Sequence, residues 1–96
     1  MRAVEFDPRA GEEIYKAAQY YEEQAGLGDE FVAAVEKGVE SIQLFPGAYA
    51  VVSGPYRRYL LKRFPYGIIY RYDAETILII AVANLRRRPQ YWLGRI

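Results

Sequence analysis

The spacing of apolar residues changes its period part of the way along the chain, and this change restricts the folds that the chain can adopt. Up to Phe45, apolar side chains recur every three or four positions, which is the spacing of an amphipathic helix. From Tyr56 onward they alternate or run continuously, which is typical of β-strands. The sequence therefore predicts helices first and a sheet afterwards.

Two helices are predicted in the first part of the chain. The first begins at Asp7-Pro8, because aspartate accepts hydrogen bonds from a first helical turn and proline suits its first position. The second follows the sequence GLGD, with Asp29 as the expected cap, and ends before Pro46. The two apolar stripes are Ala10, Ile14, Ala17, Ala18, Tyr21 and Ala25, then Phe31, Val35, Val39, Ile42 and Phe45. We expect one buried face, with the buried positions Ile14, Tyr21, Phe31, Val35 and Ile42.

Four strands are predicted, at residues 3–6, 56–64, 66–72 and 76–83. In the third, Tyr66, Ile68, Tyr70 and Tyr72 share one face, whereas the fourth is apolar on both faces and is expected in the centre of the sheet. Residues 89–96, PQYWLGRI, predict a short C-terminal helical turn. The predicted fold is α+β: a helical hairpin packed on one face of a small antiparallel sheet, in the order β-α-α-β-β-β. With 96 residues, the chain is expected to be one domain, residues 1–96.

Charge is divided unequally between the two halves of the chain. Residues 1–48 contain 4 Lys and Arg against 10 Asp and Glu, whereas residues 49–96 contain 9 against 2. This division favours an acidic partner for the second half. The simpler interpretation, acidic helices beside a basic sheet with no partner, stays open from composition alone.

Missing residue types exclude several chemistries. The chain has no cysteine and no histidine, so a transition-metal site would need carboxylates alone. The adjacent pairs Glu12-Glu13 and Glu22-Glu23 do not converge on a helix and are expected to face solvent. No glycine-rich phosphate loop follows a strand. We therefore expect no metal, no cofactor and no histidine-dependent acid–base mechanism.

No feature of the sequence directs the chain to a membrane or out of the cell. No apolar run reaches the roughly 18 residues needed to span a bilayer, and the N-terminus lacks the apolar core of a signal peptide. The expected location is the cytoplasm.

Cations and aromatic residues remain as the candidate functional groups. Guanidinium groups bind carboxylates and phosphates, and aromatic rings stack on bases. The basic residues come from the strands or their ends, so the sheet face without helices is expected to be basic and bordered by Tyr59, Tyr91 and Trp92. Tyr66 and Tyr70 are expected in the core. The predicted partner-binding or target-binding residues are Arg57, Arg58, Lys62, Arg63, Arg86, Arg87, Arg88, Tyr91 and Trp92.

Three stretches together are similar to a known family. EFDPRAGEEIYKAAQYYEEQAGLGDEF, RRYLLKRFPYGIIYRYD and ILIIAVANLRRRPQYW occur in the order typical of the RelE/ParE superfamily, over nearly the whole chain. Members are the toxins of bacterial type II toxin–antitoxin modules, also called plasmid stabilisation proteins. The resemblance implies a protein partner, an antitoxin whose C-terminal segment wraps the toxin in a hetero-oligomer.

Two branches of the superfamily differ in their targets. RelE-like members cleave messenger RNA on the ribosome, and the resemblance implies Arg58, Arg86 or Arg87, and Tyr91 as catalytic residues in that case. ParE-like members inhibit DNA gyrase instead. This chain has Leu60 and Gly67 where the ribonuclease branch has basic residues, and Asn84 where many relatives have histidine. We therefore predict a ParE-like toxin that acts by binding, with ribonuclease activity as the alternative.

Overall fold

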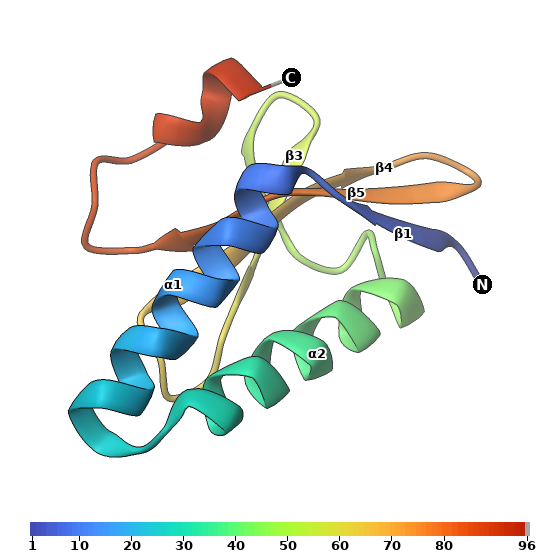
Figure 1. Cartoon of the computed structure of the whole chain (residues 1–96). Helices are drawn as coiled ribbons and strands as arrows, with labels where there is room; N and C mark the ends of the chain where they lie inside the picture. Colours follow the sequence, from blue (N-terminus) through green and yellow to red (C-terminus); the bar gives the residue numbers. More distant parts are fainter. Residues whose placement is uncertain (96) are drawn as a thin grey trace.

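A computed structural model describes residues 1–95 of the chain, in which two helices lie on one side of a five-stranded sheet (Figure 1). Ile96, which the predicted C-terminal turn included, lies outside the described residues. The α+β class and the order of the predicted elements are confirmed. The elements are β1 (Ala3–Phe6), α1 (Pro8–Ala25), α2 (Gly28–Leu44), β2 (Ala50–Ser53), β3 (Tyr56–Leu60), β4 (Tyr66–Tyr72), β5 (Thr76–Asn84) and the 3-10 helix η1 (Tyr91–Arg95).

The sheet is mixed rather than antiparallel throughout. Strands β2 to β5 pair in antiparallel fashion, but β1 runs parallel to β5, with Ala3 opposite Thr76 and Phe6 opposite Ile79. The strand order is β1-β5-β4-β3-β2, so β4 is central and β5 lies between it and β1. Apolar periodicity carries no information on strand direction or neighbours, which is why the sequence did not predict this arrangement.

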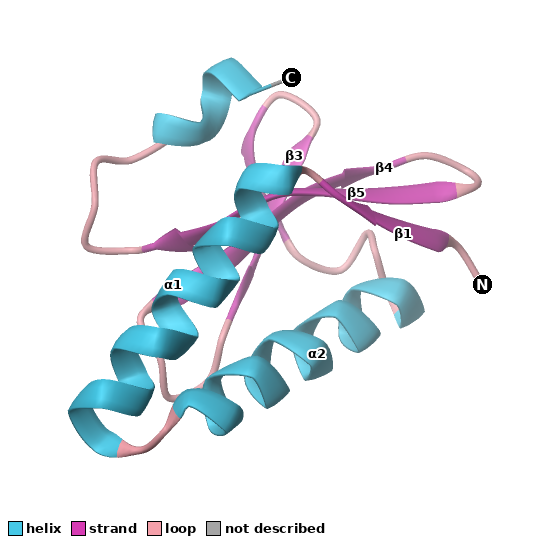
Figure 2. Cartoon of the chain, in the orientation of Figure 1, coloured by secondary structure: helices cyan, strands magenta, loops and turns pink. Residues whose placement is uncertain are grey.

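Two strand predictions needed correction. Strand β2 was not predicted, because its four residues are exposed or partly exposed and do not alternate clearly. Strand β3 ends at Leu60 rather than at residue 64, because the chain turns at residues 62–65 before β4. Figure 2 shows the short β3 leading into this loop.

The two helices begin in different ways. Asp7 caps α1 as predicted, since its carboxylate accepts the Arg9 backbone N–H at 2.8 Å. The prediction for Asp29 was wrong, because α2 begins one residue earlier and Asp29 lies within its first turn. The Gly28 backbone N–H is instead satisfied by the Glu22 side chain of α1 at 3.1 Å.

The helices and the sheet enclose the main core. Phe31, Val35 and Ile42 of α2 are buried as predicted, and Ile14 and Tyr21 of α1 are partly buried against them. Helix α2 comes so close to the sheet that a Cβ added at Gly38 would lie 2.7 Å from the Ile68 Cδ1 atom. Phe45 departs from its predicted stripe, because α2 ends at Leu44 and the Phe45 side chain is 62% exposed.

A second, smaller core lies on the opposite face of the sheet. Its buried members are Ile69, Ile80, Ala81, Ala83 and Trp92. A bulge in β5 creates part of this face: Ala81 pairs with Ile69 and Ile79 with Tyr70, which leaves the intervening Ile80 as an extra residue. Strand β5 is therefore covered on both faces, as its sequence predicted.

No helix within residues 1–95 has the length and apolar character needed to span a membrane.

Candidate functional site

The C-terminal segment folds back over the sheet face that the helices leave uncovered. Residues 85–90 form an exposed loop after β5, and η1 then places Trp92 in the second core. The Trp92 side chain is 3% exposed, and its ring packs edge to face on Tyr56 at 5.4 Å between centroids. Trp92 therefore anchors this segment, and its indole ring is not a free contact surface.

Glu13 of α1 holds the C-terminal segment in place, and sequence reasoning missed this residue. Its Oε1 atom accepts hydrogen bonds from the Val82 backbone N–H and from Arg95 Nη1, each at 3.0 Å. Its Oε2 atom accepts the Tyr91 hydroxyl and Arg95 Nη2, the latter at 2.9 Å. Arg95 Nη1 also donates to the Ile80 carbonyl at 3.0 Å. β1 does not extend along this part of the edge of β5. Glu13 and Arg95 therefore provide the hydrogen-bond partners of the Val82 N–H and the Ile80 carbonyl there.

Adjacent glutamates on α1 have different environments. Glu12 pairs with Lys16 at 2.8 Å and its side chain is 61% exposed, as expected for a solvated face. The side chain of Glu13 is 16% exposed, so the expectation of a solvated face was wrong for this residue. The only sequence signal was the position of Glu13 beside Ile14, at the border of the apolar stripe. This position does not indicate which residues Glu13 contacts.

Tyr91 is held by charged groups on several sides. The guanidinium of Arg87 lies over its ring at 4.5 Å from the centroid, and that of Arg95 lies at 5.1 Å. Burial, and then the hydrogen bond to Glu13, raise the pKa of the Tyr91 phenol well above its usual range. Tyr91 therefore stays protonated, and its hydroxyl donates a hydrogen bond to Glu13.

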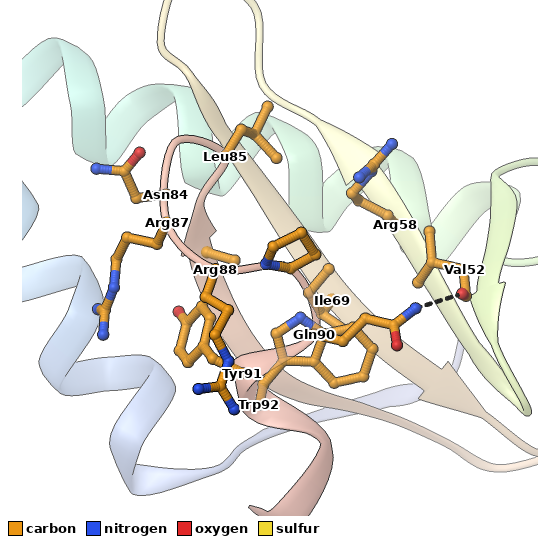
Figure 3. A pocket seen from close by; sticks show the side chains of 12 residues that line it. Val52, Arg58, Ile69, Asn84, Leu85, Arg87, Arg88, Gln90, Tyr91 and Trp92 are labelled. Carbon is orange, nitrogen blue, oxygen red and sulfur yellow. Dashed lines mark hydrogen bonds between the residues drawn. The ribbon is translucent and has the colours of Figure 1, made fainter.

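The three consecutive arginines diverge. Arg87 and Arg88 line a pocket of about 320 Å³ on the face opposite the helices, which Arg58 of β3 also lines (Figure 3). Arg86 does not line it, and its backbone N–H donates to Asn84 Oδ1 at 2.9 Å. We call this cavity the outer pocket; its lining residues are Val52, Arg58, Ile69, Ala83, Asn84, Leu85, Arg87, Arg88, Pro89, Gln90, Tyr91 and Trp92.

The absence of a side chain at Gly67 allows Arg58 to reach the outer pocket. A Cβ added at Gly67 would lie 2.9 Å from the Arg58 Cγ atom and 3.0 Å from its Cδ atom. The apolar stem of Arg58 therefore occupies the space above Gly67. A larger residue at position 67 would displace Arg58.

The remaining predicted residues lie elsewhere. Arg57 donates to the carbonyl oxygens of Gly47 at 3.2 Å and Tyr49 at 2.7 Å, and so holds the loop after α2. Lys62 and Arg63 line a different pocket, next to α2, of about 320 Å³. Tyr59 also lines that pocket and packs against the main core beside α2, so the prediction that it borders the helix-free face was wrong.

Five of the predicted residues thus meet in one place. The structure brings Arg58, Arg87, Arg88, Tyr91 and Trp92 together at the outer pocket, and separates them from Arg57, Lys62, Arg63 and Arg86. Within residues 1–95, no group of three or more acidic side chains is arranged to hold a metal ion. The outer pocket can bind an anionic group next to an apolar one, and no carboxylate lines it to accept a proton.

Comparison with known proteins agrees with this architecture. A solved structure of a chromosomal ParDE TA system from P. aeruginosa matches the chain with a TM-score of 0.67 and 16% sequence identity. The match covers 90% of this chain and 98% of that chain, and at this identity it shows a shared fold. No curated protein sequence matches the chain. The family model described as the ParE toxin of type II toxin-antitoxin system, parDE, matches residues 4–89. The chain therefore belongs to the ParE toxin family and is the toxin component of a type II toxin–antitoxin module.

Proposed function

We propose that this toxin acts by binding DNA gyrase in the cytoplasm and that a cognate antitoxin neutralises it by covering its basic surface. The hydrogen bonding of the Tyr91 hydroxyl is the observation that favours binding over catalysis. Its hydroxyl is committed to Glu13, and the carboxylate of Glu13 is itself paired with Arg95 and with the Val82 N–H.

Ribonuclease chemistry would need a group that accepts a proton from the ribose 2′-hydroxyl and another that donates to the leaving oxygen. A phenol with a raised pKa is a poor base near neutral pH. Glu13 is not free to contact a substrate, because both of its carboxylate oxygens already accept hydrogen bonds from Arg95, Tyr91 and the Val82 N–H. Asn84 carries a neutral amide that does not transfer protons near neutral pH. These groups support a toxin that works without cleaving RNA.

The basic residues favour association with a charged macromolecule. Arg58, Arg87 and Arg88 meet at the outer pocket, and none of them forms an ion pair within residues 1–95. Unpaired guanidinium groups at a surface accelerate binding to an acidic partner. The same residues would serve a ribonuclease that binds phosphates, so ribosome-dependent cleavage of messenger RNA is the second candidate.

One experiment separates the two candidates. Purified toxin is added to gyrase in a supercoiling assay, and messenger RNA ends are mapped in bacteria shortly after the toxin is induced. Blocked supercoiling with intact messages is the expected result. Rapid cuts within messages, with normal supercoiling, would overturn the gyrase proposal and make Arg58, Arg87 and Tyr91 the candidate catalytic residues. Arg71→Gln is the control for variants of those three residues, because Arg71 is exposed on β4 and does not line the outer pocket.

A further inference from the structure

The short helix η1 is attached to the rest of the fold through its side chains. Tyr91 and Arg95 bond to Glu13, and Trp92 fills the second core. Within residues 1–95, no main-chain hydrogen bond joins η1 to a strand or to either long helix. In Figure 1, the chain leaves β5 through a wide loop and returns to η1 near the start of α1. The helix η1 can therefore leave its place without breaking any strand pairing.

The site that receives η1 is built from earlier parts of the chain. We call it the seat and define it by Arg9, Glu13, Tyr56 and Ile80. The Arg9 side chain donates to the carbonyl of Arg95 at 2.8 Å, Tyr56 packs on Trp92, and the Ile80 carbonyl accepts from Arg95 at 3.0 Å. Because none of these four residues belongs to η1, every copy of the protein carries a complete seat. An η1 from a second copy would make the same contacts in it.

The joint between β5 and η1 is short, exposed and strained. The turn directly after β5 is held locally, since the Arg87 N–H donates to the Asn84 carbonyl at 3.1 Å. Residues 88–90 follow as the joint, and all three are exposed. Gln90 has a φ of 59°, a left-handed conformation that is costly for a residue with a Cβ atom. The residue before Pro89 favours an extended backbone. An extended joint would therefore suit this sequence better than the closed one.

We propose that two copies of the protein exchange η1, so that Arg95 of each copy pairs with Glu13 of the other. Short joints under strain favour such exchange, because the contacts in the seat are kept and only the joint changes conformation. Association costs translational freedom, so the exchanged dimer forms as the concentration rises. Each outer pocket then combines Arg58 of one copy with Tyr91 and Trp92 of the other. The inference concerns the assembly of this chain and does not depend on the target of the toxin.

The ion pair in the seat allows a direct test by crosslinking. Arg95→Lys keeps a positive charge beside Glu13 and supplies an amine that a carbodiimide joins to the Glu13 carboxylate. Isotopically heavy and light chains of this variant are unfolded together and refolded at high concentration. High salt screens the basic faces of the two copies during refolding. Exchange predicts crosslinked peptides that join Glu13 of a heavy chain to position 95 of a light chain.

The same sample contains its own control. Glu12 and Lys16 lie 2.8 Å apart on α1, so the carbodiimide joins them within one chain. Crosslinks between these two residues should never mix isotopes. Sedimentation of the unmodified protein over the same concentrations measures the dimer independently. Its dimer fraction should rise with concentration in step with the mixed crosslinks of the Arg95→Lys variant.

Two variants of the joint test whether strain at Gln90 drives the exchange. Gln90→Gly removes the Cβ atom and with it the cost of the left-handed conformation. Gln90→Ala is the matched control, because it keeps the Cβ atom and loses the same hydrogen bond to the Val52 carbonyl. The association constant of the Gly variant should be lower than that of the Ala variant by about tenfold or more, since the left-handed conformation costs on that scale.

Two crosslinking results would overturn the inference. One is that crosslinks between positions 13 and 95 never mix isotopes at any concentration, although crosslinks between Glu12 and Lys16 form. The other is a dimer in sedimentation whose crosslinks between positions 13 and 95 stay unmixed, because association would then use another surface. Equal association constants for the Gly and Ala variants would overturn the role assigned to the strained joint.

Discussion

Glu13 and Arg95 form an ion pair that joins the first helix to the last described residue, with the two guanidinium nitrogens of Arg95 at 2.9 and 3.0 Å from the carboxylate oxygens. Both side chains are largely buried, at 16% and 13% exposed. An ion pair removed from water is costly to break from one side, because the other charge is left without a partner. The pair therefore fixes where the C-terminal segment lies.

Replacing Glu13 should destabilise the protein far more than replacing its neighbour. Glu13→Gln leaves Arg95 without a counter-charge, and we expect a loss of about 3 kcal/mol in the free energy of unfolding. Glu12→Gln, which breaks an exposed pair with Lys16, should cost less than about 0.5 kcal/mol. Urea unfolding followed by Trp92 emission measures both. Equal effects of the two variants would contradict the anchoring role of Glu13.

Truncation in the main core should be costly. Ile42 is 0% exposed, so Ile42→Ala removes buried methyl groups and leaves a cavity. The expected loss is about 2–5 kcal/mol in the free energy of unfolding. Leu44→Ala is the control, because Leu44 is 55% exposed and should change stability by about 0.5 kcal/mol or less. Chemical denaturation of both variants checks the prediction, and similar midpoints would contradict it.

Stability at alkaline pH should depend on Tyr70. Burial raises the pKa of the Tyr70 phenol to about 12, and its hydroxyl donates to the Pro46 carbonyl at 2.5 Å. The unfolded chain ionises this group near pH 10. The contribution of Tyr70 is therefore complete below about pH 10 and is lost as the pH rises through 12.

Tyr70→Phe tests this dependence. At pH 8 it should cost about 1 kcal/mol, because the Pro46 carbonyl loses its donor. Between pH 10 and 12, the free energy of unfolding of the variant should fall less steeply than that of the wild-type protein. Parallel slopes over this range would show that Tyr70 does not titrate as described.

Stability at acidic pH should depend on Asp7. Its hydrogen bond from the Arg9 side chain, and then that from the Arg9 backbone, hold the pKa of the Asp7 carboxyl below its usual range. The resulting stabilisation is present above the unfolded pKa of about 4 and is lost as the pH falls through the lower folded value. Asp7→Asn keeps a capping oxygen but does not titrate. Its unfolding free energy should therefore fall less between pH 4 and pH 2, and Glu5→Gln at an exposed position is the control.

Charge reversal on the basic half should slow association with the antitoxin. Arg87→Glu and Arg63→Glu change two different pockets, so their effects on the association rate should be nearly independent. Both should also flatten the dependence of that rate on salt, because steering by surface charge is screened by ions. Stopped-flow association at several salt concentrations measures this. Unchanged rates for both variants would exclude electrostatic steering.

Elements with strong local signals were predictable from the sequence. The stripe that contains Phe31, Val35 and Ile42 specified which face of α2 is buried, and Asp7-Pro8 specified where α1 begins. The family resemblance was also visible, since its motifs are local and ordered. Periodicity and capping act over a few residues, and this is the range over which a sequence can be interpreted without coordinates.

Features that depend on distant residues were not predictable. Glu13 contacts Val82, Tyr91 and Arg95, which lie 69, 78 and 82 residues away in the sequence, and no local pattern indicates these partners. The same holds for Trp92, which sequence reasoning placed on the binding surface and which the structure buries to 3% exposure. The bulge at Ile80 also depends on the pairing of two strands and leaves no local signal.

The parallel pairing of β1 with β5 sets the moment at which the toxin surface can form during translation. β1 is synthesised well before its partner residues 76–79, and Glu13 is synthesised 82 residues before its partner Arg95. Loop closure over such a span must precede the contacts that stabilise it. A nascent chain that stops before residue 76 has no partner for β1 and no outer pocket. The outer pocket therefore cannot form until the chain has been synthesised through residue 92, and no shorter N-terminal fragment presents it.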